Sequence, residues 1–276
     1  MSLENTVISN KTVPILSKQF QDNPAIYEIG IDEAGRGPLF GRLYVAAVIL
    51  PKDNESGTNF FHKDIKDSKK IKSKKKMTAV SEYIKTNALA YSIQYIEHSE
   101  IDEINIRQAV FRAAHRCVKD VYDCVLDQSS FNMPPKGAEM NGLEQSLCTS
   151  KMCKDLEKKR EESPKFHILM DGNDFIPYTH FDKETDRIVS IPYDTIEGGD
   201  NKFLSIAAAS ILAKDARDKY ISELCGENPV LVERYALDKN MGYGTRKHLD
   251  GILEHGITQF HRRTYGQCKT ARMNEI

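Results

Sequence analysis

The sequence predicts an α/β fold in which helices cover a mixed sheet of five strands. Apolar stretches typical of strands come first, and two more strand-like stretches then alternate with helical patterns. The five predicted strands are residues 25–31, 43–50, 89–96, 166–170 and 187–191. Because successive strands favour antiparallel pairing and intervening helices favour parallel pairing, we expect a mixed sheet.

Three long segments place apolar residues at helical spacing and are predicted helices. They are residues 76–88, 99–122 and 203–224, the last rich in small side chains. In the second segment, Ser99 with Asp102 three residues later has the pattern of a helix N-cap. These helices are expected to cover the sheet.

Changes in composition divide the chain into a main domain and three other parts. We expect a tail at 1–25, a catalytic domain at 26–222 and a helical appendage at 223–276, which contains a helical pattern at 245–256. Residues 127–164 combine prolines and glycines with a charge-rich stretch, which indicates an insertion. We find no internal repeat, and the insertion suggests no function.

The composition is ordinary for a globular protein, with 40% apolar and 29% charged residues among 276. The longest apolar runs, 43–50 and 203–213, are too short to cross a membrane, and the N-terminus lacks a secretory pattern. None of the six cysteines forms a C-x-x-C pair, so we expect reduced thiols. The expectation is a soluble, intracellular monomer, cytoplasmic or, in a eukaryotic host, nuclear.

The net charge of −1 hides two basic stretches. Residues 63–76 hold eight lysines against two aspartates, and a second basic stretch runs from 261 to 269. Local basic patches on a nearly neutral chain suit a polyanion partner combined with a separate acidic site. A solvated lysine-rich face is the alternative.

The acidic site has a candidate in the stretch GIDEAGRGPLFG, where Asp32 and Glu33 end the first predicted strand. The glycines after them do not form a nucleotide-binding motif. Phe40 stands where a dinucleotide fingerprint needs its third glycine, and no lysine follows Gly41 as a P-loop requires.

Metal binding gives a physical reason for adjacent acids, because neighbouring carboxylates resist ionising together unless a cation neutralises them. Mg²⁺ prefers oxygen ligands, and two such ions about 4 Å apart can drive phosphodiester hydrolysis. Asp171 also directly follows a predicted strand, and ligands of α/β folds tend to bind at strand ends. A plain solvated turn is the alternative interpretation.

Further motifs follow GIDEAGRGPLFG along the chain: DSKKI, IDEINI, MDGN, GGDNKFLSIAAASILAKDARD, and GYGTRKHL followed by HGITQFHRRTYG. Together they resemble type 2 ribonuclease H, or ribonuclease HII, in the order of that family and over most of 26–122 and 166–268. The resemblance implies a ribonuclease H-like fold with two divalent ions, Mg²⁺ or Mn²⁺. It implies cleavage of the RNA strand of RNA–DNA hybrids and incision 5′ of single ribonucleotides in duplex DNA.

The implied products are 3′-hydroxyl and 5′-phosphate ends, and the implied setting is DNA replication and ribonucleotide excision repair. The resemblance assigns metal binding and catalysis to Asp32, Glu33, Asp171 and Asp200. For the last position Asp194 and Glu197 compete, but the family carboxylate precedes the long helix directly.

Asp218 is a tempting fifth carboxylate that we leave out. In one continuous helix from 200 to 218 it would lie about 27 Å from Asp200. We expect it to pair with a basic group instead.

The resemblance also assigns substrate contacts. Gly35, Arg36 and Gly37 match the loop that recognises the ribonucleotide 2′-hydroxyl, the group that distinguishes RNA from DNA. Tyr243 matches a tyrosine that packs on the next sugar, and Lys69 matches a lysine on the substrate backbone.

Two departures from the family pattern remove positive groups near the substrate path. Gly198 replaces a lysine, and Asn240-Met241 replaces His-Lys. No histidine has a convincing place as a general base, and His248 and His261 are expected to face the nucleic acid or the core. The functional alternatives are a metal nuclease of other specificity, a catalytically silent nucleic-acid-binding module, and an NTPase, which the missing P-loop lysine disfavours.

Overall fold

The protein is described by a computed structural model. It covers residues 16–23, 25–51, 65, 68, 71, 73–126, 165–182, 185–274 and 276, and the backbone of 147–148. Lys69 and nearly all of the predicted insertion lie outside these residues.

The main sheet has the order β4-β3-β2-β1-β5-β8. Its strands are β1 (Ile26–Ala34), β2 (Leu43–Ile49), β3 (Ala90–Ile96), the two-residue edge strand β4 (Leu147–Cys148), β5 (Lys165–Asp171) and β8 (Tyr193–Ile196). β1, β2 and β3 pair antiparallel, whereas β5 is parallel to both β1 and β8. The predicted mixed sheet of five strands is therefore confirmed, with β4 added at one edge.

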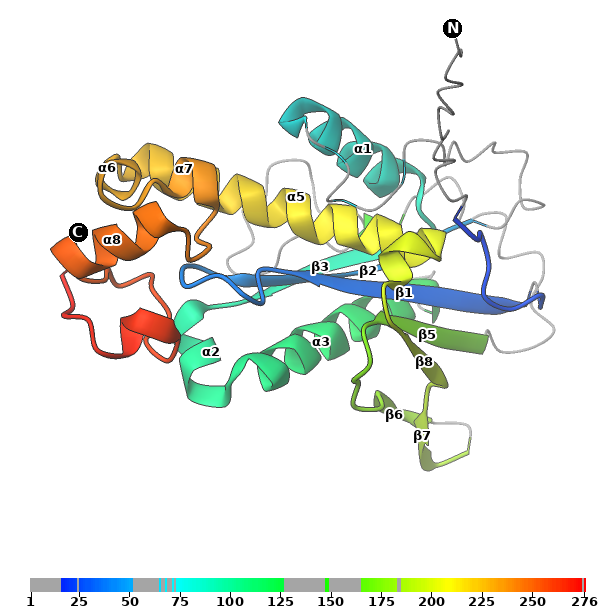
Figure 1. Ribbon diagram of the computed structural model, residues 1–276. Helices are drawn as coiled ribbons and strands as arrows, with labels where there is room; N and C mark the ends of the chain where they lie inside the picture. Colours follow the sequence, from blue (N-terminus) through cyan, green and yellow to red (C-terminus); the bar gives the residue numbers. More distant parts are fainter. Residues whose placement is uncertain are drawn as a thin grey trace, which may run out of the picture.

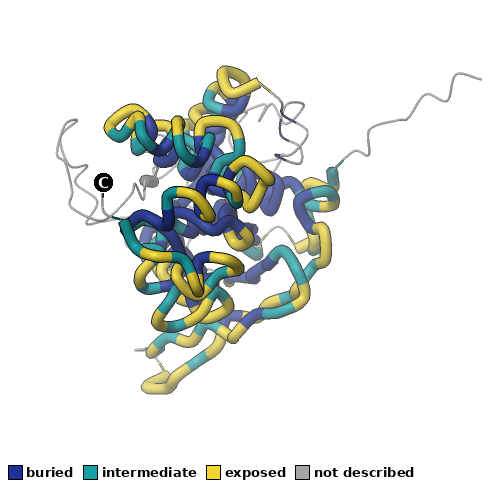
Figure 2. The backbone as a smooth tube through the Cα atoms, turned by 60° about the vertical axis from the view of Figure 1, so that its left-hand side comes forward, coloured by how far each residue is buried: buried dark blue, intermediate teal, exposed yellow. Residues whose placement is uncertain are grey.

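The fifth strand was predicted at the wrong place. Residues 187–191 contribute β7 (Arg187–Ser190), which pairs with β6 (Thr179–Asp182) in a separate, mainly exposed hairpin (Figures 1 and 2). β8 instead pairs with β5. The apolar residues of 187–191 resemble a strand of the main sheet, but Ile188 is 75% exposed and only Ile191 reaches the core.

Helices cover both faces of the sheet (Figure 1). They are α1 (Lys74–Asn87), α2 (His98–Ile104), α3 (Ile106–Leu126), α5 (Leu204–Glu227), α6 (Val230–Tyr235), α7 (Leu237–Asn240) and α8 (Arg246–His255), with 3₁₀ turns η4 (Gly199–Asn201) and η5 (Gly266–Lys269). One apolar core lies between the sheet and α1 and α5, and a second between the sheet and α3. β2 is buried on both faces, which explains its continuous apolar run.

The helix predicted at 99–122 is two helices, and its predicted N-cap is wrong. Asn105 interrupts the helix with φ 67° and ψ 161°, a strained conformation for any residue but glycine, and its side chain accepts from Gln108 N–H at 3.1 Å. Ser99 lies inside α2. Asp102 instead accepts the backbone N–H groups of Arg263 and Thr264, at 2.7 and 2.9 Å, so it holds a distant segment.

The C-terminal elements share the core of the sheet. Leu231, Tyr235, Leu237 and Ile252 belong to the same apolar cluster as α5. These elements gather at the C-terminal end of α5 (Figure 1). Among the side chains that the structure describes, the cysteines are free and buried: Cys117, Cys124, Cys225 and Cys268. No helix among the described residues is long and apolar enough to cross a membrane.

Strand β1 and helix α5 touch through their backbones at Gly30. A Cβ at this position would lie 2.5 Å from the backbone nitrogen of Ile206 and would overlap the carbonyl carbon of Ser205. Close approach of this kind needs glycine, and it fixes the height of α5 over the strand that carries Asp32.

Gly30→Ala is therefore expected to lower the free energy of unfolding by about 3 kcal/mol, the upper end of the usual overpacking cost. Gly226→Ala is the matched control, because a Cβ there meets nothing within 4 Å. The control should leave stability unchanged or raise it by up to about 1 kcal/mol. Urea denaturation measures both, and equal stability of the two variants would contradict the backbone contact.

Candidate active site

Two of the predicted carboxylates lie side by side because β1 and β5 are parallel. Ile31 pairs with Met170 in the register, so Asp32 and Asp171 are the next residues of neighbouring strands. Side chains alternate along a strand, and both carboxylates follow residues that face the α3 core. Asp32 and Asp171 therefore project on the α5 face of the sheet.

Glu33 is the next residue of β1, and its carboxylate lies 3.4 Å from the Arg36 guanidinium. It affects its neighbour electrostatically. Burial raises the pKa of Asp32 well above its ordinary value, and the charges of Glu33 and Asp171 raise it further. A hydrogen bond from Ser210 on α5 and one from the Glu33 N–H, at 2.7 Å, act in the opposite direction.

The turn η4 brings Asp200 to the same end of the sheet. Gly199 N–H donates to Asp171 Oδ1 at 2.7 Å, and the next residue is Asp200, which is 2% exposed and accepts from the Asn201 amide at 2.9 Å. Gly198 has φ 62°, a conformation that favours glycine and starts the turn. The glycine that replaces a family lysine thus has a local structural role.

The donor chemistry fits a divalent cation, because the buried Asp32 carboxylate, whose pKa the charges of Glu33 and Asp171 help to raise, would be stabilised by a hard cation with oxygen ligands. Among the residues that the structure describes, no three His, Cys, Asp or Glu side chains already surround one point at metal-ligand geometry. The carboxylates lie at the same end of the sheet, but they are not arranged around a common point as metal ligands are.

The competing acids have other partners. Asp194 is 2.8 Å from His167 Nε2, and Glu197 is exposed and accepts weakly from Asn173 at 3.3 Å. Asp218 forms an ion pair with Lys214, the basic partner expected for it. These contacts favour Asp200 as the fourth carboxylate.

Two buried arginines hold the glycine loop. Arg262 donates to the carbonyl oxygens of Gly35, Arg36 and Gly41 at 2.7, 3.1 and 3.0 Å. Gly35 has φ 97°, and a Cβ there would overlap the guanidinium of Arg217. Burial lowers the pKa of Arg262 to about 10, so this residue keeps its charge at neutral pH.

The basic stretch 261–269 was therefore partly misassigned to a polyanion partner. Arg262 and His261 are fully buried and face the loop and the core. Sequence reasoning missed the role of both arginines. Arg217 had a signal, because it stands four residues from Ala213 and from Ile221, on the buried side of α5.

Tyr243 lies beside the loop. A Cβ on Gly37 would be 3.8 Å from Tyr243 Cε1, and the Arg217 guanidinium lies 5.8 Å from the tyrosine ring centroid. Tyr243 is 49% exposed, and Arg36 is exposed as well. The predicted substrate-contact residues Gly35, Arg36, Gly37 and Tyr243 are thus brought together.

A chain of buried histidines fixes the backbone of Tyr243. His248 Nδ1 lies 3.0 Å from the Tyr243 carbonyl oxygen and must donate to it, so its Nε2 accepts from His261 Nε2 at 3.1 Å. His261 Nδ1 then accepts from Thr258 N–H at 2.9 Å. Both histidines are neutral in this arrangement and face the core, one of the two expected positions.

The family model for ribonuclease HII matches residues 29–125 and 122–268. The chain belongs to the ribonuclease HII family. It is 38% identical over 252 residues to ribonuclease HII of Bacteroides thetaiotaomicron, covering 91% of this chain and 96% of the relative. It is 37% identical over 238 residues to that of Parabacteroides distasonis, covering 86% and 89%.

Two solved structures share the fold. Ribonuclease H2 from Pyrococcus horikoshii OT3 aligns with a TM-score of 0.53 at 18% identity, over 88% of this chain and 96% of that one. Ribonuclease HII of Archaeoglobus fulgidus, solved in a complex with PCNA, aligns with a TM-score of 0.53 at 20% identity, over 87% and 96%. The predicted family and ribonuclease H-like fold are confirmed, and the chain is a type 2 ribonuclease H endonuclease.

The histidine chain makes stability depend on pH. Burial lowers the pKa of His261 from 6.5 to about 3, so between these values the unfolded chain binds a proton that the folded chain excludes. Stability contributed by this group is full above about pH 6.5 and falls as the pH drops. By pH 5 the loss is about 2 kcal/mol.

We expect His261→Gln to be less stable than wild type at pH 7, and the difference to shrink by about 2 kcal/mol at pH 5. Urea unfolding at both pH values measures this. Subtracting the free energy of unfolding of the variant from that of wild type at each pH cancels the contributions of the other titrating groups. His255→Gln, outside the histidine chain, is the matched control for losing one histidine. If the difference in the free energy of unfolding between wild type and His261→Gln is the same at pH 7 and pH 5, the neutral state of the buried His248–His261 pair is contradicted.

Proposed function

We propose that this ribonuclease HII cleaves the RNA strand of RNA–DNA hybrids and incises 5′ of single ribonucleotides in duplex DNA, leaving 3′-hydroxyl and 5′-phosphate ends. The observation that supports this proposal most is that the carboxylates lie next to the glycine loop. Asp32, Asp171 and Asp200 gather at one sheet end, and the chain runs from Glu33 directly into a rigid glycine loop next to an exposed tyrosine. Acid and sugar-contacting groups are thus within one short segment.

Asp32, Glu33, Asp171 and Asp200 are the residues that would hold two divalent ions, Mg²⁺ or Mn²⁺. Bound there, the ions would supply an activated water and neutralise charge on the scissile phosphate. Ser210 orients the Asp32 carboxylate and is itself 2.9 Å from the Ser68 hydroxyl. The proposed site needs no residue from a second copy, and a monomeric enzyme is proposed.

Recognition of the ribonucleotide is assigned to the loop at Gly35, Arg36 and Gly37. Arg262 engages the carbonyl oxygens of the first two residues, so the loop meets a sugar in a fixed conformation. The exposed Gly37 leaves room for a sugar beside the Tyr243 ring. Preorganised backbone groups can bond a 2′-hydroxyl at close approach, which a DNA sugar lacks. Lys69 stays a proposed backbone contact.

The function is tested with three substrates in Mg²⁺ and in Mn²⁺: duplex DNA, the same duplex with one ribonucleotide, and an RNA–DNA hybrid. Wild type should cut the last two only. Asp171→Asn should bind them with near wild-type affinity but turn over at least about 10³-fold more slowly. The amide can still accept from Gly199 N–H, so the turn should persist.

Cleavage of plain duplex DNA would favour a nuclease of other specificity, and binding without cleavage in either metal would favour a silent module. Asp250→Asn is the matched control, because Asp250 is an exposed carboxylate that pairs with Arg246 on α8. Wild-type rates for Asp171→Asn would contradict its assignment.

The loop offers a separate test, because its two glycines have different surroundings. Gly37→Ala adds a methyl that meets only Tyr243 at an ordinary 3.8 Å, so the fold should be unchanged. The same methyl occupies space proposed for the sugar, and cleavage at a single ribonucleotide should fall at least about tenfold, with binding weakened. Gly172→Ala is unsuitable as a control because of its φ of 98°, so Gly226→Ala serves. Unchanged cleavage by Gly37→Ala would remove the loop from recognition.

A further inference from the structure

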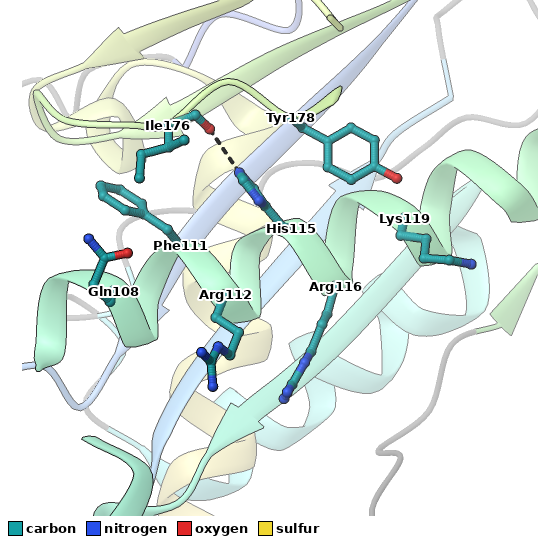
Figure 3. A pocket seen from close by; sticks show the side chains of 8 residues that line it. All are labelled: Gln108, Phe111, Arg112, His115, Arg116, Lys119, Ile176 and Tyr178. Atoms are coloured by element: carbon teal, nitrogen blue, oxygen red, sulfur yellow. Dashed lines mark hydrogen bonds between the residues drawn. The ribbon is translucent and has the colours of Figure 1, made fainter. Parts of the chain in front are cut away.

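A hollow of about 470 Å³ lies between α3 and residues 174–178, which follow β5 (Figure 3). Its apolar lining is Phe111 of α3 together with Ile176 and Tyr178 from the facing segment. Phe111 is buried, whereas Ile176 is 37% exposed, so apolar surface is open to a ligand.

The wall of the hollow is held in place. His115 Nε2 lies 2.8 Å from the Ile176 carbonyl oxygen, as the dashed line in Figure 3 shows. The His115 ring also meets Tyr178 edge to face, with centroids 5.6 Å apart. The segment 174–178 is thereby fixed against α3 with its aromatic side chain at the edge of the hollow.

The rim is cationic. Arg112, Arg116 and Lys119 line the hollow from one side of α3. Glu100 lies 2.6 Å from Arg112 and 4.0 Å from Arg116, so one carboxylate faces two guanidinium groups. Both arginine side chains are 48% exposed. Lys119 pairs with Asp123, so three basic side chains face two carboxylates, and the remaining positive charge favours an anionic ligand.

The segment that lines the hollow follows β5, although Asp32 and Asp171 themselves project on the opposite, α5 face of the sheet. Asp171 ends β5, and three residues later Asp174 forms a two-point ion pair with Arg107 at the start of α3, at 2.5 and 2.9 Å. The hydrogen bond from Arg107 lowers the pKa of Asp174, and the Arg36 charge of the glycine loop lowers it further, so the loop lies near this pair. A nucleic-acid strand that passes Arg36 can therefore run along α3 toward the hollow.

We propose that this hollow is a subsite for single-stranded nucleic acid that leaves the active site, with an unpaired base on Tyr178 and Ile176 and phosphates at Arg112 and Arg116. Aromatic side chains beside a basic track are the usual way to bind single strands. An unpaired base can swing out to stack on Tyr178, whereas a base held in a duplex is already stacked and paired, so the subsite suits an unpaired tail. This inference rests on the proposed function, because it takes the substrate to be nucleic acid.

The test compares a blunt duplex containing one ribonucleotide with the same duplex carrying a single-stranded tail at the 5′ or the 3′ end of the cleaved strand. For Asp171→Asn, which should bind without turnover, fluorescence anisotropy should give about tenfold tighter binding with the tail on one of the two ends. Adding Arg112→Gln and Arg116→Gln should abolish this gain in affinity. The slope of the logarithm of the binding constant against the logarithm of the salt concentration should fall by about 0.7 per lost phosphate contact. Adding Arg246→Gln instead is the matched control, since Arg246 is an exposed arginine paired with Asp250 on α8.

A direct readout is photocrosslinking of a tail that carries 5-iodouridine, mapped by mass spectrometry, which should label Tyr178. The two arginine substitutions in an otherwise wild-type chain should leave cleavage of the blunt duplex unchanged, which separates the subsite from the proposed function. No gain from either tail, or an equal loss of affinity for blunt and tailed duplexes, would overturn the subsite. Binding of a polyglutamate peptide without any binding of the tail would also overturn the subsite, in favour of an acidic protein partner.

Discussion

The parallel pairing of β1 with β5 is the constraint on which the rest of the structure depends. It makes Asp32 and Asp171 neighbours, and it leaves the α5 face of the same two strands open to the turn that carries Asp200. Gly30 then allows α5 to approach closely enough for Ser210 to reach Asp32. A shift of this register by one residue would turn Asp171 to the opposite face.

The second half of the site is assembled by residues far along the chain. Arg262 and His261 come from the segment 258–262, and His248 comes from α8. Arg262 fixes the glycine loop, and the two histidines fix the backbone of Tyr243. Asp102 anchors the residues that follow. The C-terminal elements are therefore as important to the shape of the proposed recognition surface as the sheet is to the carboxylates.

Much of this could be predicted from sequence, because buried strands and the acids at their ends are local patterns. Four of the five strand segments and the long helix from 204 were found within a few residues. The break at Asn105 was missed because the apolar spacing continues across it, and residues 187–191 have strand propensity without a place in the main sheet. The buried Arg262 could not be recognised, because its partners are carbonyl groups more than 200 residues earlier in the chain.

The position of Arg262 has a consequence for biosynthesis. All four carboxylates are made by residue 200, so the acidic end of the sheet can form early while the chain is still growing. The guanidinium that fixes the glycine loop is synthesised 62 residues later, which is the difference between positions 262 and 200. A growing chain thus completes the proposed metal-binding carboxylates before it contains the guanidinium that fixes the proposed recognition loop.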